Sequence, residues 1–118
     1  NPLQKELIKV RASQINGCAF CLDMHTRDAR KLGETEQRLY LLNAWRESPQ
    51  FSEEERIILA MTEEITLISK RGLTDETYDK AIQHFGETGT AQLIMMVVTI
   101  NSWNRISVAT RRVPGQRI

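Results

Sequence analysis

Apolar residues recur along this chain at the three- to four-residue spacing of amphipathic helices. The first stripe consists of Leu3, Leu7, Ile8, Val10, Ala12 and Ile15. This stripe predicts a helix over residues 3–15. Asn16-Gly17 ends it, because glycine readily adopts the left-handed backbone that follows a helix C-terminus. A second helix is predicted over residues 18–32, closed in the same way by Gly33.

Capping residues predict the next two helices. Thr35 can act as the N-cap of a third helix, which continues through Trp45 and is broken at Pro49. Ser52 starts the fourth helix, and Glu55, three residues later, completes a capping box. Both starts are polar residues whose side chains can accept a backbone N–H that the first helical turn leaves unpaired.

The second half of the chain predicts two more helices. The fourth helix is expected to end at Gly72, and Thr74 then caps a fifth, which Gly86 closes. A sixth begins at residues 88–90 and reaches Thr110. No pair of segments shows the alternating polarity of β-strands. The sequence therefore predicts an all-α fold, a single-domain helical bundle of about six helices.

Length and charge limit the functions to be considered. The 118 residues suffice for one domain, residues 1–118. Lys and Arg number 16 and Asp and Glu 15, so no strong net charge favours nucleic acid, and no nucleic-acid partner is expected. The longest apolar run, residues 91–100, is too short to cross a membrane, so no membrane association is expected.

The chain begins with Asn1 rather than Met, so we expect the natural protein to extend further at this end.

The most informative motif is Cys18-Ala-Phe-Cys21-Leu-Asp-Met-His25, which holds both cysteines of the chain. On a helix, Cys18, Cys21 and His25 share one face, because they are three and four residues apart. Two thiols at this spacing can form a disulfide, and the free N–H groups of a helix start stabilise a thiolate. His25 is placed to take the thiol proton. The motif predicts redox chemistry in which a sulfenic acid on one cysteine is trapped by the other as a disulfide.

A cysteine pair that cycles between two states suits a reducing compartment. Two cysteines are also too few for the disulfide framework of a small secreted protein. The chain shows no charged start followed by an apolar signal segment. We therefore expect a cytoplasmic protein.

A structural zinc site is the alternative interpretation of the motif. The spacing C-x2-C-x3-H supplies three ligands, and His84, the other histidine, would complete a Cys2His2 set. Three ligands on one continuous helix face close a tetrahedron poorly, however, and nothing near His84 marks it as a partner. Redox chemistry is therefore favoured, and no metal is expected.

Residues 6–29 resemble the core motif of the alkylhydroperoxidase D-like (AhpD-like) family, which shares its fold with carboxymuconolactone decarboxylase. The family pattern is a glutamate, eleven intervening residues, C-x-x-C, three further residues and a histidine. Its positions are filled by Glu6, Cys18, Cys21 and His25. The resemblance implies an AhpD-like fold and a thiol-dependent peroxidase that reduces hydroperoxides. The decarboxylase branch lacks the C-x-x-C, so its chemistry is disfavoured here.

The resemblance also implies a role for each residue. Cys21 would be the peroxidatic thiol, and Cys18 the resolving thiol that closes the disulfide. Glu6 and His25 would form a proton relay to Cys21 through a bound water. The redox-active disulfide Cys18–Cys21 would be the redox group, with no separate cofactor, and a lipoyl-protein or a thioredoxin-like donor would reduce it again.

One position departs from the pattern of the best-studied members. Phe20 stands between the cysteines where those members carry a histidine. This change removes a proton carrier and makes the mouth of the site more apolar. It keeps open a second function, that of a redox-responsive oligomeric or binding protein without efficient turnover.

The last predicted helix carries apolar residues on a side that is broad for a simple surface helix. They are Met95, Met96, Val97, Val98, Ile100 and Trp103. We interpret this helix as part of the core that also packs against a partner chain. The resemblance implies a homo-oligomer, a trimer or a hexamer.

Overall fold

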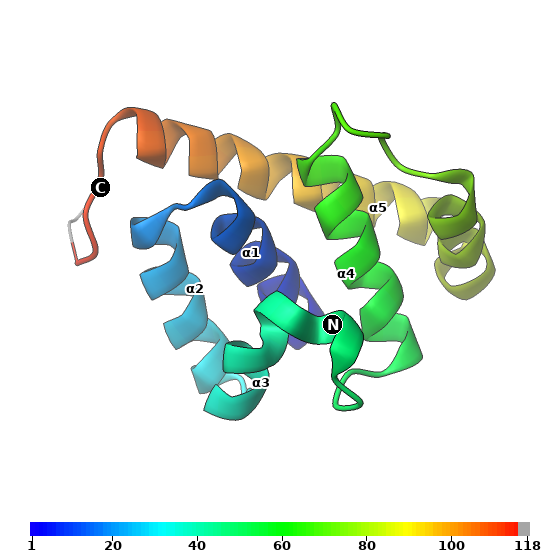
Figure 1. The fold of residues 1–118 in the computed structure, drawn as a ribbon, viewed down its shortest axis with the longest axis horizontal. Helices are drawn as coiled ribbons and strands as arrows, with labels where there is room; N and C mark the ends of the chain where they lie inside the picture. Colours follow the sequence, from blue (N-terminus) through cyan, green and yellow to red (C-terminus); the bar gives the residue numbers. More distant parts are fainter. Residues whose placement is uncertain (116–118) are drawn as a thin grey trace.

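The computed structural model describes residues 1–115, which form helices joined by short loops (Figure 1). The elements are, in chain order, α1 (Pro2–Asn16), α2 (Ala19–Lys31), α3 (Glu36–Leu41), the 3-10 segment η1 (Leu42–Glu47), α4 (Glu53–Thr66) and α5 (Asp75–Ala109). No strand occurs within residues 1–115. The predicted all-α class is confirmed. No helix in this part of the chain combines the length and the apolar character needed to span a bilayer.

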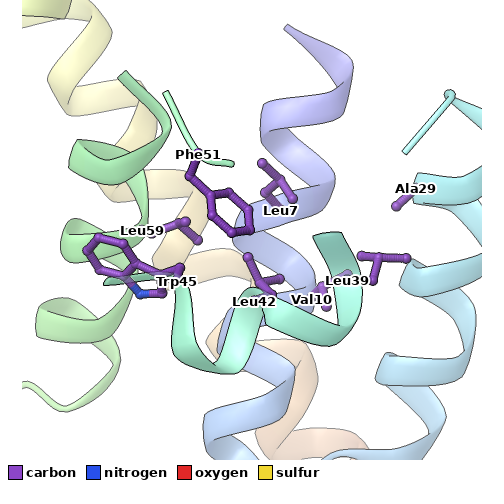
Figure 2. Packing of buried hydrophobic residues seen from close by; sticks show 8 residues of the cluster. All are labelled: Leu7, Val10, Ala29, Leu39, Leu42, Trp45, Phe51 and Leu59. Atoms are coloured by element: carbon purple, nitrogen blue, oxygen red, sulfur yellow. The ribbon is translucent and has the colours of Figure 1, made fainter. Parts of the chain in front are cut away.

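Helix α1 is the central element, because α2, α4 and α5 all pack against it (Figure 1). Its residues Leu7, Ile8 and Val10 are fully buried. Figure 2 shows the cluster that joins α1 to α2, α3, η1 and α4, formed by Leu7, Val10, Ala29, Leu39, Leu42, Trp45, Phe51 and Leu59. A second cluster joins α1 to α4 and α5 and consists of Ile8, Ala12, Ile58, Val97 and Ile100. Burial on several sides leaves α1 little freedom to turn or slide.

Most predicted helix ends are confirmed. Thr35, Ser52 and Thr74 are N-caps whose side chains each accept the backbone N–H of the residue three positions later. Ser52 and Glu55 form the predicted capping box. Gly17 follows α1 in the left-handed conformation, with φ of 69°. The local signals for helix starts and stops were therefore sufficient at these positions.

The third predicted helix is only partly regular. It continues as an α-helix to Leu41 and then tightens into η1, where Ala44 leaves the helical region with φ of −129° and ψ of 36°. Pro49 has no N–H to offer the carbonyl of Trp45, four residues earlier. That carbonyl accepts the N–H of Ser48 at 3.1 Å, and the guanidinium of Arg56 on α4 also binds it, together with two other carbonyls of this segment. A contact from a distant element therefore helps to hold η1 in place.

In the second half of the chain, one predicted helix end differs from the structure and one predicted break agrees with it. Helix α4 ends at Thr66, earlier than predicted, and the hydroxyl of Thr66 accepts a hydrogen bond from Asn101. The Glu64 carboxylate accepts the N–H of Thr74 at 2.7 Å, which ties the following loop to α4. The predicted break at Gly86 is present as a kink in α5, with φ of 71° and ψ of 179°. The fifth and sixth predicted helices are thus the two parts of α5 (Figure 1).

A partly buried carboxylate joins α1, η1 and α4. The Glu63 carboxylate accepts hydrogen bonds from Arg11 Nη2 at 2.9 Å, from Trp45 Nε1 at 2.8 Å and from Arg46. Burial by itself raises the pKa of Glu63, but the hydrogen bonds from Arg46, Trp45 and Arg11 outweigh it and hold this pKa below its ordinary value of 4.5. The folded state therefore favours the ionised carboxylate.

We predict that Glu63→Gln lowers the free energy of unfolding by about 2 kcal/mol at neutral pH, because Arg11 and Trp45 lose a charged acceptor. The contribution of the Glu63 charge is fully present above its ordinary pKa of 4.5 and is lost as the pH falls through the lower pKa of the folded state. Urea unfolding at a series of pH values measures both effects. The exposed Glu47→Gln is the matched control. The account would be contradicted if the difference in the free energy of unfolding between wild type and Glu63→Gln did not shrink at acidic pH.

Candidate active site

A tight turn carries the first cysteine from α1 to α2. The N–H of Cys18 donates to the carbonyl of Ser13 at 3.1 Å, and Gly17 supplies the left-handed residue of the turn. Cys18 is then the N-cap of α2, and its Sγ accepts the N–H of Cys21 at 3.2 Å. Because only Gly17 and Cys18 separate the two helices, the end of α1 determines where the first sulfur lies.

The two cysteines are joined by a disulfide, with 5.3 Å between their Cα atoms. Each is only 2% exposed, and Phe20 packs with them in a small buried cluster. Cys21 lines a cavity between α1, α2 and α5, whereas Cys18 is not among the residues that line it. The two sulfurs therefore differ in access, although both are nearly buried.

Glu6 lies in the interior and is hydrogen-bonded to the predicted imidazole. Its side chain comes from α1 and is 5% exposed, and its Oε1 lies 3.3 Å from Nδ1 of His25. An ionised carboxylate can only accept this hydrogen bond from Nδ1, and in a neutral imidazole that arrangement leaves the lone pair on Nε2. The other oxygen of Glu6 lies 3.2 Å from Nζ of Lys9, and Oδ2 of Asp28 lies 3.9 Å from the same Nδ1. The buried carboxylate thus has a partner for each oxygen.

The cavity beside these residues has a volume of about 940 Å³. Cys21 and His25 both line it. Much of its wall is apolar and includes Phe20, Met24, Met95, Met96 and Trp103. An apolar space that contains both a sulfur and an imidazole can hold the organic part of a substrate while a proton moves between the two groups.

A buried network of amides holds the end of α1 against α5. Asn104, which is fully buried, donates to Ser13 Oγ at 3.0 Å and accepts from Asn16 Nδ2 at 2.9 Å. Asn16 also donates to Asn101, which donates in turn to Thr66 at the end of α4. The network therefore fixes the residues that immediately precede the Gly17–Cys18 turn.

The structure brings the four predicted site residues together. Glu6 contacts His25, Cys18 is bonded to Cys21, and His25 and Cys21 line one cavity. Their catalytic roles stay predictions.

Among the apolar residues of the last predicted helix, Val97 and Ile100 are buried, but Met95 and Trp103 are half-exposed and line the cavity.

The sequence did not single out every charged residue near the site. Lys9 follows Glu6 by three residues and Asp28 follows His25 by three, so helical spacing was a signal that could have found both. Arg112, which also lines the cavity, had no such signal, because a chain reversal after α5 brings it there.

The Cys2His2 zinc set is not assembled. His84 lies on the first part of α5, with Nε2 3.9 Å from the carboxylate of Glu53. The candidate metal ligands that the described residues do bring together are Glu6, His25 and Asp28, without a cysteine. The ammonium of Lys9 already neutralises Glu6. The zinc interpretation is therefore not supported by the placement of these residues.

Comparisons with known proteins agree with the motif. Residues 1–64 match the model of the carboxymuconolactone decarboxylase family. The chain is similar to the uncharacterised protein YdfG of Bacillus subtilis (strain 168), with 52% identity over 109 residues that cover 92% of this chain and 74% of the relative. It is also similar to the uncharacterised protein YnjA of Escherichia coli (strain K12), with 26% identity over 102 residues, 82% of this chain and 53% of the relative.

Two solved structures share the fold. One is a protein of unknown function from Agrobacterium tumefaciens, for which the name antioxidant defence protein AhpD has been suggested; it has a TM-score of 0.92 and 38% identity over 97% of this chain and 78% of that chain. The other is an uncharacterised peroxidase-related protein from Silicibacter sp. TM1040, with a TM-score of 0.83 and 26% identity over 98% of this chain and 60% of that chain. The resemblance to the AhpD-like fold is confirmed.

We predict that Asn104→Leu lowers the free energy of unfolding by about 2 kcal/mol, because Ser13 and Asn16 each lose a buried hydrogen-bond partner. Urea unfolding measures this change. Ser102→Ala, at an exposed position of the same helix, is the control and should stay within about 0.5 kcal/mol of wild type. A change of similar size in both variants would show that the network does not hold α1 against α5.

Proposed function

Because this chain belongs to the carboxymuconolactone decarboxylase family and has the AhpD-like fold, we propose that it is a thiol-dependent peroxidase. The observation that carries the proposal is the hydrogen bond between Glu6 and His25 at the wall of the cavity that Cys21 also lines. This bond orients the imidazole and leaves Nε2 free to act as a base toward the thiol.

The first half of the cycle oxidises Cys21. In the reduced protein, Nε2 of His25 takes the thiol proton of Cys21, directly or through a water. The thiolate attacks the distal oxygen of the hydroperoxide, the O–O bond breaks, and Cys21 becomes a sulfenic acid. The alkoxide leaves with the proton that His25 returns, as an alcohol. The two electrons come from the sulfur of Cys21.

The second half forms the disulfide. The sulfur of Cys18 accepts the N–H of Cys21 at the start of α2, a position that stabilises a thiolate. Cys18 attacks the sulfenic sulfur of Cys21, the S–S bond forms, and the hydroxyl group leaves as water after taking a proton. The Cys18–Cys21 disulfide of the structure is the bond that this step would form, which supports the proposal.

The burial of both sulfurs bears on the electron donor. Each cysteine is 2% exposed, so a donor must enter the cavity to reach Cys21. A lipoyl arm is narrow and apolar and suits this route, whereas the thiol of a thioredoxin-like protein lies on a folded surface. We therefore favour a lipoyl-protein as donor. A dithiol that is reduced in every turnover also suits the cytoplasm, where we propose that the protein acts.

The outer side of α5 supports self-association. Val98 is 44% exposed and Ile106 is 52% exposed, and neither residue lines the cavity. Exposed apolar residues that follow one another along a helix are typical of association surfaces. We propose a homo-oligomer, a trimer or a hexamer, in which this side of α5 contacts a second copy.

We predict that Cys21→Ser slows peroxide consumption by the pre-reduced protein at least about 1000-fold, because the nucleophile is lost. Cys18→Ser is the matched variant. It should consume one equivalent of peroxide and stop with one oxygen added to Cys21, because nothing resolves the sulfenic acid. Peroxide assays and intact mass measure both results.

Full activity of Cys21→Ser would contradict the assignment of the nucleophile. A wild-type protein that changes its oligomeric state on oxidation but does not turn over with a lipoyl donor would instead favour the redox-responsive binding protein.

A further inference from the structure

Several titratable side chains face the cavity beside Cys21. Those on its wall are Lys5, Lys9, His25, Glu54 and Arg112. Lys9 is paired with Glu6, His25 is hydrogen-bonded to Glu6, and Glu54 accepts a hydrogen bond from Gln4. The cavity wall therefore carries three cations, Lys5, Lys9 and Arg112, and one anion, Glu54, and the proposed peroxidase reaction uses none of these cations.

Arg112 contacts the dithiol motif directly. Its guanidinium carbon lies 5.1 Å from the centre of the Phe20 ring, and Phe20 directly precedes Cys21. Within residues 1–115 no carboxylate forms an ion pair with Arg112. A guanidinium stacked on an aromatic face keeps its N–H donors at its edges, so these donors remain available for an anion.

The backbone holds Arg112 in this place. Helix α5 ends at Ala109, and Arg111 adopts a positive φ of 57°, which reverses the chain. The N–H of Arg112 then donates to the carbonyl of Ser107 at 2.9 Å. Arg112 and Ser107 both line the cavity. The cation is thus presented to the cavity by a defined turn.

We propose that the preferred substrate is an organic hydroperoxide that carries a carboxylate, and that Arg112 binds this carboxylate. The inference rests on the proposed peroxidase function and adds a substrate class to it. A single guanidinium matches a monoanionic carboxylate, which it can bind with two parallel hydrogen bonds. The apolar body of the substrate packs against Met96 and Trp103, and its peroxide group lies at Cys21.

The carboxylate takes no part in the chemistry. The Cys21 thiolate attacks the distal peroxide oxygen, the O–O bond breaks, and Cys21 becomes a sulfenic acid. The alkoxide receives the proton held by His25 and leaves as a hydroxy acid. Arg112 is therefore a specificity-determining residue, and its effect should depend on the charge of the substrate.

The test compares cumene hydroperoxide with its para-carboxylate derivative in single-turnover reactions of the full, pre-reduced chain, followed by tryptophan fluorescence. The wild type should react about tenfold faster with the carboxylated compound at low concentration, the size expected for a charge-assisted hydrogen bond. Arg112→Gln should reduce the ratio of the two rates, carboxylated over uncarboxylated, to about one. Arg112→Lys should restore part of this ratio. High salt should also lower the wild-type ratio.

Arg71→Gln is the matched control, because it removes an exposed arginine that does not line this cavity, and it should keep the wild-type ratio. A wild-type ratio near one would overturn the proposal. So would an Arg112→Gln variant that slows both substrates equally, which would indicate an effect on the thiolate.

A binding measurement separates this inference from the proposed function. Calorimetry with the oxidised protein compares cumyl alcohol with its para-carboxylate, neither of which can react. The wild type should bind the carboxylate about tenfold more tightly, and Arg112→Gln should lose that advantage. If neither hydroperoxide is consumed but this preference is found, the peroxidase function fails while the carboxylate site stands. If the wild type binds cumyl alcohol and its para-carboxylate equally well, the proposal of a carboxylate site is overturned.

Discussion

The arrangement of this protein depends on a carboxylate buried on its central helix. Glu6 lies on α1 among residues that contact three other helices, and it is 5% exposed. A charge in such a place is costly unless it has partners. Lys9 supplies one from the same helix, and His25 supplies the other from α2. The need to pair Glu6 therefore constrains how α2 is rotated and how far it is displaced along α1.

That constraint reaches the sulfurs through a short connection. Once His25 is held against Glu6, Cys21 lies one turn earlier on α2, on the same side of the helix. The Gly17–Cys18 turn closes the other end, and the Asn16–Asn104 contact holds the residue before it. Both ends of the motif are thus attached to α1, which gives the dithiol a defined position at the wall of the cavity.

Local signals predicted much of the fold but not its long-range contacts. The caps at Thr35, Ser52 and Thr74 and the break at Gly86 follow from the chemistry of a few neighbouring residues. The contacts that hold η1 could not be predicted, because they include a guanidinium from α4. The contacts of Glu63 could not be predicted either, since this residue of α4 binds Arg11 on α1 and Trp45 and Arg46 on η1.

In the candidate site, too, residues close in sequence were predictable, whereas residues brought in by long-range contacts were not. Cys18, Cys21 and His25 are close in sequence, so their shared face was predictable from helical spacing alone. Glu6 was found through the resemblance to a family, because a single glutamate on an apolar helix gives no sign of its burial. The place of Arg112 at the cavity was not predicted, since this residue reaches it through a reversal of the chain beyond α5.

The central claim is that Glu6 and His25 act on Cys21 as one unit. The most direct test is the second-order rate constant of the pre-reduced protein with cumene hydroperoxide, measured for wild type, Glu6→Gln, His25→Asn and the double variant. His25→Asn keeps a hydrogen-bond donor beside Glu6 but has no base. We predict that each single variant is about 100-fold slower and that the double variant is at most about threefold slower than His25→Asn. The claim would be contradicted if the double variant were slowed by the product of the two single-variant factors. It would also be contradicted if His25→Asn reacted as fast as wild type.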